Sequence, residues 1–171
     1  MTDEAAMQYV ALGDLDKAAI LYERYKRPLY NFYLRFGLER DSSQDLTQQV
    51  FYRLIHYRNT FREGYEFRTW IYRIARNIYH DFLKEHSHNH KDLHENIEVA
   101  EEENYDDEQH LLIQKALAKL APEYQEVLRM SRYDELKYEE IADILNISVS
   151  LVKVRVHRGL KQLKEEYLKL N

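Results

Sequence analysis

The chain has 171 residues, enough for one medium-sized domain or two small ones, and its four Gly and two Pro are typical of long helices with short connections. Because it contains no Cys, disulfides and thiolate metal sites are excluded, which suits the cytosol. No apolar stretch is long enough to span a bilayer and the acidic N-terminus lacks the basic start of a secretion signal, so we expect a soluble cytoplasmic protein.

Charge is distributed unevenly along the chain. Asp and Glu outnumber Lys and Arg by 30 to 25, yet residues 23–84 carry twelve basic and only seven acidic side chains. Residues 85–109 carry one Lys against ten acidic side chains, a composition that cannot bury enough apolar surface to fold alone. We therefore predict an all-α protein of two small helical domains, residues 1–84 and 110–171, joined by a flexible acidic linker, residues 85–109.

The first predicted element is a helical stretch from Gly13 to Gly37, with Asp14 as its N-cap and Gly37 as its C-terminal stop. Pro28 should kink this helix or divide it in two. Four of the fifteen Tyr residues of the chain lie here. We interpret them as core and rim residues without chemistry.

Two further helices are predicted between residues 41 and 84, separated by a loop around residues 62–64. The apolar face of the first consists of Leu46, Val50, Leu54 and Ile55. Its polar face consists of Asp45, Gln48, Gln49 and Arg53. The second helix has an apolar stripe made of Phe67, Trp70, Ile71, Ile74, Ile78 and Phe82.

The opposite face of that second helix carries the residues most typical of nucleic-acid binding. At helical spacing it presents Arg73, Arg76, Asn77 and His80. Its aromatic neighbours are Phe61, Tyr65, Trp70 and Tyr72. Cations for the backbone beside rings on which an unpaired base can stack favour single-strand capture. Alternatively the rings fill the core and the arginines are merely solvated; we favour this for Phe67 and Phe82 and leave it open for Trp70.

The linker contains a histidine cluster, made of His86, His88, His90 and His94. Imidazoles in a flexible tract can collect metal adventitiously or make the charge of the linker pH-sensitive. A functional metal site needs a rigid frame and supporting partners, which the sequence does not supply. We expect neither a metal nor a cofactor.

Residues 110–171 show four helical repeats of apolar residues. Pro122 disfavours a helical residue before it, so the first helix should stop near Ala121 and the second should begin at Pro122. Asn146 tolerates the left-handed conformation that ends a helix, and Ser148 is a fair N-cap for the next one. The predicted core residues, helix by helix, are Leu112, Leu117 and Leu120; Val127, Leu128 and Met130; Ile141, Ala142 and Leu145; and Val149, Val152, Val156, Leu160 and Leu163.

The last two of these helices have the spacing of a helix-turn-helix. Between Val149 and Lys164 the sequence has five Lys or Arg and no carboxylate, which indicates an anionic partner such as DNA. The candidate contacts to phosphates and base edges are Ser148, Ser150, Lys153, Arg155, His157, Arg158 and Lys161. The alternative is a solvated charged helix.

Two blocks of the sequence resemble a known family. The segment YEEIADILNISVSLVKVRVHRGLKQLKE, with LAPEYQEVLRM ahead of it, resembles region 4 of bacterial RNA polymerase sigma factors of the extracytoplasmic-function (ECF) group of the sigma-70 family. The segments DLTQQVFYRLI and NTFREGYEFRTWIYRIARNIYHDFLK resemble region 2. Both blocks in this order imply a sigma factor, not an enzyme, that directs core polymerase to specific promoters and opens them to initiate transcription.

The resemblance also implies a role for each set of residues. The coiled coil of the polymerase largest subunit would contact Asp45, Gln48, Gln49 and Arg53. The minus-ten promoter element would be recognised and melted by Asn59, Thr60, Phe61, Arg68, Trp70, Arg73, Arg76, Asn77 and His80. The minus-thirty-five element would be read by Ser148, Ser150, Leu151, Lys153, Arg155, His157, Arg158 and Lys161. The polymerase flap and an anti-sigma factor are further expected partners, and the acidic linker would either thread a polymerase channel or simply be solvated.

Other function classes remain as alternatives. A stand-alone helix-turn-helix regulator, whose N-terminal bundle binds a ligand or dimerises, explains the second block equally well but gives the Arg- and Asn-bearing helix no purpose. A histidine-based metal enzyme or metal store lacks a framework, and the sequence has no nucleophile–base pair or Gly-rich phosphate loop. The sequence also leaves open whether the free chain is extended or compact with its DNA faces hidden, which opposite charges on the linker and the two domains would favour.

Overall fold

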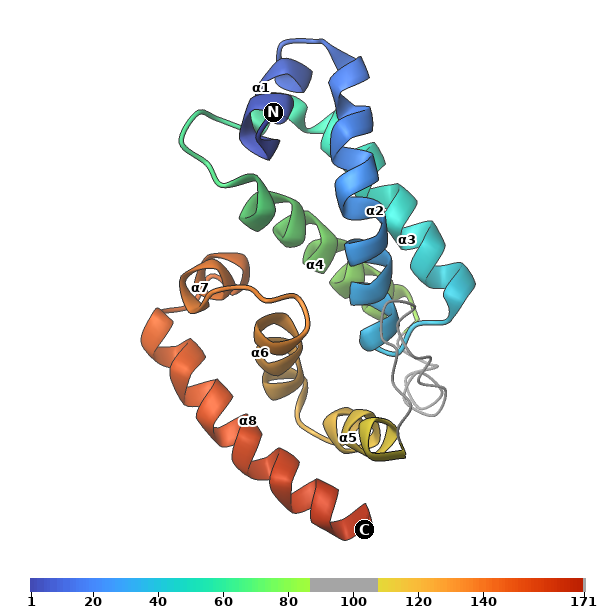
Figure 1. The fold of residues 1–171 in the computed structure, drawn as a ribbon, viewed down its shortest axis with the longest axis vertical. Helices are drawn as coiled ribbons and strands as arrows, with labels where there is room; N and C mark the ends of the chain where they lie inside the picture. Colours follow the sequence, from blue (N-terminus) through green and yellow to red (C-terminus); the bar gives the residue numbers. More distant parts are fainter. Residues whose placement is uncertain (87–107, 171) are drawn as a thin grey trace.

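A computed structural model describes residues 1–86 and 108–170, and this part of the chain forms eight α-helices and two 3₁₀-helices without any strand (Figure 1). The all-α fold class is therefore confirmed. The N-terminal domain comprises α1 (Asp3–Ala11), η1 (Leu15–Lys17), α2 (Ala18–Arg35), α3 (Arg40–His56), η2 (Arg58–Thr60) and α4 (Phe67–Glu85). The C-terminal domain comprises α5 (Glu108–Ala118), α6 (Pro122–Arg132), α7 (Tyr138–Leu145) and α8 (Val149–Leu170). Most of the predicted linker, with His88, His90 and His94, lies outside the described residues.

The core of the N-terminal domain lies between α2, α3 and α4. As predicted, the apolar stripes of α3 and α4 are buried at Leu46, Val50, Leu54, Phe67, Ile71 and Ile78. The hydroxyl of Tyr33 on α2 donates a hydrogen bond of 2.8 Å to the backbone carbonyl of Ala75 on α4, which ties these two helices together. Each fully buried apolar side chain contributes about 1.5–3 kcal/mol, so this core fixes the orientation of α4.

Helix α1 was not predicted from the sequence. The Thr2 hydroxyl accepts a hydrogen bond of 3.1 Å from the backbone N–H of Ala5 and caps the helix. The Asp3 carboxylate accepts a 2.6 Å hydrogen bond from the hydroxyl of Tyr25 on α2. Glu4 accepts a 3.0 Å hydrogen bond from the backbone N–H of Phe67, at the positive N-terminal end of α4. Two acidic side chains of α1 thus link it to α2 and α4.

The predicted start of the first helical stretch is wrong. Asp14 precedes the short η1 helix without a side-chain cap, and α2 begins only at Ala18. Pro28 lies inside α2 and does not divide it. A proline removes one N–H from the helical hydrogen bonds, and the buried side chains that follow it, such as Leu29, offset that loss by packing. Gly37 ends the stretch as predicted, with a φ of 88°.

The helix-turn-helix of the C-terminal domain forms largely as predicted. Pro122 starts α6, Asn146 ends α7 with a φ of 55°, and the Ser148 hydroxyl accepts a 3.1 Å hydrogen bond from the backbone N–H of Leu151. The prediction of Leu160 as a core residue is wrong, because its side chain is 53% exposed. Gly159 occupies the buried face instead, so close to α6 that an added Cβ would lie 3.1 Å from the Leu128 side chain.

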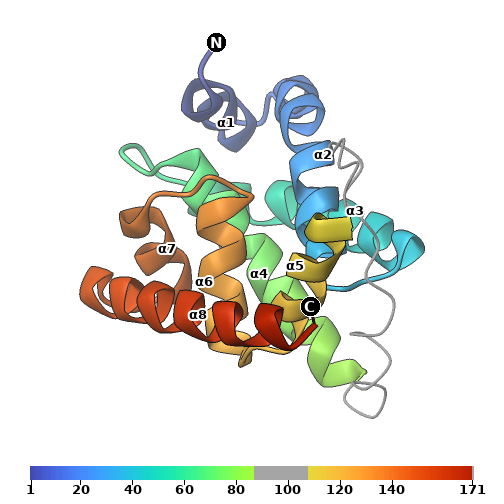
Figure 2. The same cartoon turned by 60° about the horizontal axis from the view of Figure 1, so that its bottom comes forward.

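The two domains pack against each other, with α4 on one side and α6 and α7 on the other (Figure 1). Helix α8 packs on α5, α6 and α7 at the outer edge of the C-terminal domain (Figure 1), and in the turned view it runs across the front of this domain (Figure 2). Of the two arrangements that the sequence leaves open, the structure has the compact one, but it does not hide both predicted DNA faces, because the basic residues of α8 such as Lys153 and Arg158 are exposed.

Candidate nucleic-acid interface

The polar face of α3 is open to solvent. Asp45, Gln48 and Gln49 are exposed, and half-buried Arg53 forms an ion pair of 3.2 Å with Asp81 of α4. Beside this face, an open groove of about 570 Å³ separates α3 from the C-terminal part of α4. The buried residues on the opposite side of α3 hold the face outward. All four residues predicted to contact polymerase therefore lie together.

The aromatic residues near the loop before α4 are mostly buried, contrary to the predicted aromatic surface. Phe61 is 6% exposed and Trp70 is 9% exposed, and their rings meet edge to face with centroids 5.4 Å apart. Tyr72 is 3% exposed, whereas Tyr65 is 47% exposed. Asn59 and Thr60 are also exposed. The buried rings of Phe61 and Trp70 therefore support the loop from the core. The ring of this group that a base can reach is that of Tyr65.

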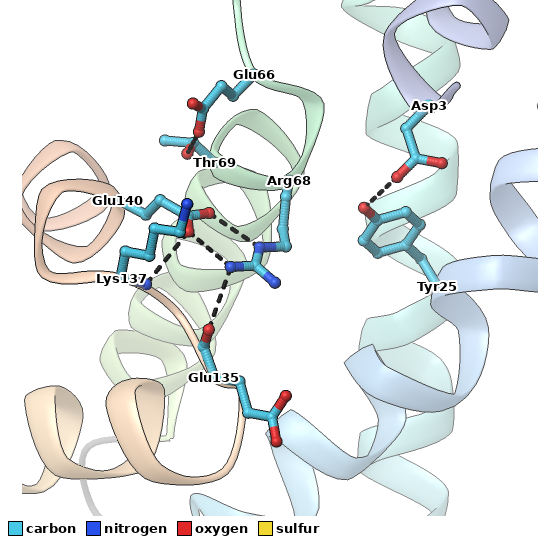
Figure 3. A network of polar contacts seen from close by, with 8 residues as sticks. All are labelled: Asp3, Tyr25, Glu66, Arg68, Thr69, Glu135, Lys137 and Glu140. Atoms are coloured by element: carbon cyan, nitrogen blue, oxygen red, sulfur yellow. Dashed lines mark hydrogen bonds and ion pairs between the residues drawn. The ribbon is translucent and has the colours of Figure 1, made fainter. Parts of the chain in front are cut away.

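The cationic face of α4 meets the C-terminal domain. The guanidinium of Arg68 donates two hydrogen bonds to Glu140 of α7, at 2.9 Å from Nε and 2.6 Å from Nη2, and a third of 3.2 Å to the Glu135 carbonyl (Figure 3). Burial raises the pKa of Glu140, but hydrogen bonds from Arg68 and the Lys137 N–H outweigh it and lower that pKa. Arg68 is thus held by an ionised carboxylate.

The next residues along α4 make similar contacts. Arg73 donates a 2.8 Å hydrogen bond to the Asp143 carbonyl, near the negative C-terminal end of α7. Arg76 and His80 both contact Glu126 of α6, at 2.8 Å and 3.0 Å. Burial raises the pKa of Glu126, but hydrogen bonds from His80 and Arg76 outweigh it and lower that pKa. Asn77, between these residues, is exposed.

A second cluster of charges lies between the domains and was not identified from the sequence. Arg35 of α2 approaches Asp134 at 3.4 Å and stacks over the Tyr133 ring, 5.0 Å from its centroid. The guanidinium of Arg129, which is 2% exposed, lies over the Phe36 ring at 5.6 Å. Burial raises the pKa of Asp134 to about 7, against the opposing effect of nearby Arg35. The only sequence signal was an Arg on the apolar side of α6.

The predicted recognition helix is free of this interface. Among its candidate DNA contacts, the exposed residues are Ser148, Ser150, Leu151, Lys153, His157, Arg158 and Lys161. Arg155 is half-buried. The buried residues Val152 and Val156 face α6 and α7, which leaves the basic side of α8 facing outward. The predicted minus-thirty-five set is therefore accessible, whereas all four basic side chains in the predicted minus-ten set contact the other domain.

Within residues 1–86 and 108–170, no helix is long and apolar enough to cross a membrane. The same part of the chain contains no group of three His, Asp or Glu side chains arranged to hold a metal ion. The predicted histidine cluster of the linker, apart from His86, lies outside it.

Comparison with known proteins gives matches to both blocks. Residues 21–89 match the Sigma-70 region 2 family and residues 110–163 match the Sigma-70, region 4 family. The ECF RNA polymerase sigma factor SigW of Bacillus subtilis (strain 168) is 29% identical over 178 residues, covering 94% of this chain and 94% of SigW. RNA polymerase sigma factor SigZ of the same organism is 32% identical over 148 residues, covering 85% of this chain and 84% of SigZ. The sigma factor RpoE of Bartonella quintana, solved in complex with the anti-sigma factor NepR, shares the fold with a TM-score of 0.68, at 21% identity over 92% of this chain and 98% of that chain.

Proposed function

This chain belongs to the sigma-70 family of RNA polymerase sigma factors, and we propose that it binds core RNA polymerase and directs it to specific promoters, where it recognises and opens the DNA. One observation carries the proposal: both sigma regions occur in order in a chain that spans almost the full length of the ECF sigma factor SigW. Sigma factors are transcription initiation factors, so we assign the chain a binding role rather than a catalytic one.

Residues 1–84 are the polymerase-binding and minus-ten domain in this proposal. The exposed side chains of Asp45, Gln48 and Gln49 support α3 as the surface for the coiled coil of the largest subunit. They present hydrogen-bonding groups on one helical face, without burial that would oppose docking. Arg53 contributes from the edge of this face, where Asp81 already orients its guanidinium.

The minus-ten element is assigned to the loop before α4 and to the cationic face of α4. Extruding a base from a duplex costs a few kcal/mol, which stacking on a ring and a shaped pocket can offset. Exposed Tyr65 supplies the ring, with Asn59 and Thr60 as polar neighbours, while buried Phe61 and Trp70 shape the loop. The phosphate contacts are assigned to Arg68, Arg73, Arg76 and His80, with Asn77 as a base contact.

Residues 110–171 are the minus-thirty-five domain, with α8 as the recognition helix and residues 85–109 as the connection. The outward basic face of α8 suits the major groove, which admits an α-helix. Each domain offers a small footprint, so promoter specificity should require both domains held by polymerase, through its coiled coil and flap. Because RpoE of Bartonella quintana was solved with an anti-sigma factor, we extend the proposal to an anti-sigma partner for this chain.

The first test is co-elution of the purified chain with bacterial core RNA polymerase, followed by transcription from a pool of genomic fragments. We expect a stable complex that starts RNA downstream of a shared two-part sequence. Failure to bind polymerase, together with salt-sensitive binding of duplex DNA by the chain alone, would instead indicate a stand-alone regulator.

A further inference from the structure

The two DNA-binding surfaces of the free chain are not equally available. The α8 face is exposed, whereas four side chains assigned to the minus-ten element contact α6 or α7. We propose that the free chain is autoinhibited at this one site: carboxylates and backbone carbonyls of the C-terminal domain bind the α4 cations in place of DNA. The identity of the excluded ligand rests on the proposed function, but the closed arrangement does not.

The carboxylates of the C-terminal domain are suited to compete with phosphate for the cations of α4. A carboxylate, like a phosphate, offers two oxygens that match the fork of donors on a guanidinium. Glu140 takes both Nε and Nη2 of Arg68, and Glu126 takes Arg76 and His80. Glu126 and Glu140 are each only 7% exposed, whereas the side chains of Arg68 and His80 are 37% and 40% exposed, so solvent and salt screen these contacts only in part. DNA cannot reach the same donors until the carboxylates leave.

The second cluster of charges shows that the closed form is a packed interface and not a loose encounter. Arg35 and Arg129 each lie over an aromatic ring, at 5.0 Å and 5.6 Å from the centroids. Arg129 takes its ring, Phe36, from the other domain, and the Asp134 side chain beside Arg35 is 2% exposed. Groups of this kind are rarely buried unless a specific contact holds them. Opening must therefore disrupt both this cluster and the carboxylate contacts of α4.

The surface left free in the closed form indicates what could open it. The polar face of α3 remains exposed, so a partner that docks there need not displace the C-terminal domain first. A polymerase that binds α3 and also holds the C-terminal domain at a fixed distance would separate α4 from α6 and α7. The minus-ten surface would then appear only on polymerase, which prevents the free chain from binding single-stranded DNA elsewhere.

The test is a double variant, Glu126→Gln with Glu140→Gln, compared with Glu123→Gln plus Glu139→Gln. The control changes two exposed carboxylates on the same two helices, so both proteins gain the same net charge. Since the chain has no Cys, one dye can be placed in each domain at Leu12→Cys and Leu168→Cys, both exposed positions, to report the distance between domains by energy transfer. Binding of a labelled single-stranded DNA of random sequence is measured in parallel, without polymerase.

We expect the Glu126→Gln, Glu140→Gln variant to lose energy transfer and to bind single-stranded DNA about tenfold more tightly than the control, because its open fraction rises. Each single variant should have an energy transfer and a DNA affinity between those of the control and those of the double variant. This graded response guards against a folding defect of the double variant. Equal energy transfer and equal DNA affinity in variant and control would overturn the proposal. Adding core polymerase to the wild-type chain should also reduce energy transfer. Loss of polymerase binding would contradict the proposed function alone, because the first two measurements use only the free chain.

Discussion

Glu140 uses one carboxylate for two structural contacts. It accepts the backbone N–H of Lys137 at 3.2 Å, at the start of α7, and also binds the guanidinium of Arg68. A lysine side chain has no acceptor with which to cap a helix, so the capping of α7 depends on this carboxylate. Glu140 therefore caps the first helix of the helix-turn-helix and also connects it to the N-terminal domain.

At the same scale, two aromatic residues of one loop differ in role. Phe61 is buried in the core, whereas Tyr65 is exposed at the surface. Phe61→Ala should lower the free energy of unfolding by about 3–5 kcal/mol, because it removes a buried ring. Tyr65→Ala should lower it by less, about 1 kcal/mol or below, because the Tyr65 side chain is 47% exposed. Urea denaturation of the two variants measures the difference.

Tyr65 should nevertheless matter for promoter opening. With polymerase, Tyr65→Ala should slow the formation of permanganate-reactive, unpaired thymines at the promoter about tenfold, since one base loses about 1–3 kcal/mol of stacking. Tyr65→Phe keeps the ring and is the matched control. Unchanged opening in Tyr65→Ala would show that the flipped base does not stack on this ring.

At the scale of elements, α8 shows how a glycine on a buried face can make a prediction from apolar spacing wrong. The sequence indicates Leu160 as the next apolar residue after Val156, but the face toward α6 continues through Gly159. Gly159 is invisible to an apolar count, although its lack of Cβ is what allows the two helices to approach. The buried position was therefore assigned to its neighbour.

This close approach gives a stability prediction for the C-terminal domain. Gly159→Leu should lower the free energy of unfolding by about 1–3 kcal/mol, because the added side chain overlaps Leu128 and Tyr124. Leu160→Ala should change it by less than about 0.5 kcal/mol, because Leu160 is exposed. Thermal and urea unfolding of both variants tests the order. A larger loss for Leu160→Ala would contradict the packing described for α8.

Helices α4 and α8 should also differ in the step of initiation that they control. Arg158→Ala should weaken the initial binding of polymerase to the promoter, because it removes a contact to the upstream element. Asn77→Ala should leave that binding unchanged and slow DNA melting. Asn77 is chosen because its side chain is exposed in the closed form. Filter binding measures docking and permanganate reactivity measures melting; equal docking defects with normal melting in both variants would refute this division.

At the scale of the whole molecule, the sequence indicates the helices and the two blocks but not how the blocks meet. Periodicity and capping residues such as Pro122 and Ser148 are local signals, and they correctly place most of α3 to α8. The contacts of Arg68 with Glu140 and of Arg76 with Glu126 join positions 72 and 50 residues apart, which no local pattern records. For the same reason the sequence indicates a cationic face on α4 but not the carboxylates that occupy it.

The buried Asp134 predicts that closure depends on pH. Its pKa is about 7 in the closed form, against an ordinary value of 3.8 that it should regain in water once the domains separate. The closed form therefore binds this proton more tightly, so closure is favoured as pH falls and weakened as pH rises through 7. The charged and titratable groups around the carboxyl are Arg35 of α2, Arg68 and Tyr72 of α4 and Arg129 of α6.

Between pH 6 and pH 8 the ratio of closed to open wild-type chain should fall about tenfold, because one proton is released as the domains part. Asp134→Asn should lose this dependence, because the carboxyl that takes up the proton is then absent. The lowered pKa values of Glu126 and Glu140 place the loss of their ion pairs at lower pH, outside this window. Energy transfer between the two domains measures the ratio. If Asp134→Asn kept the full dependence, Asp134 would not be the titrating group, and protonation of the interface would have to occur elsewhere.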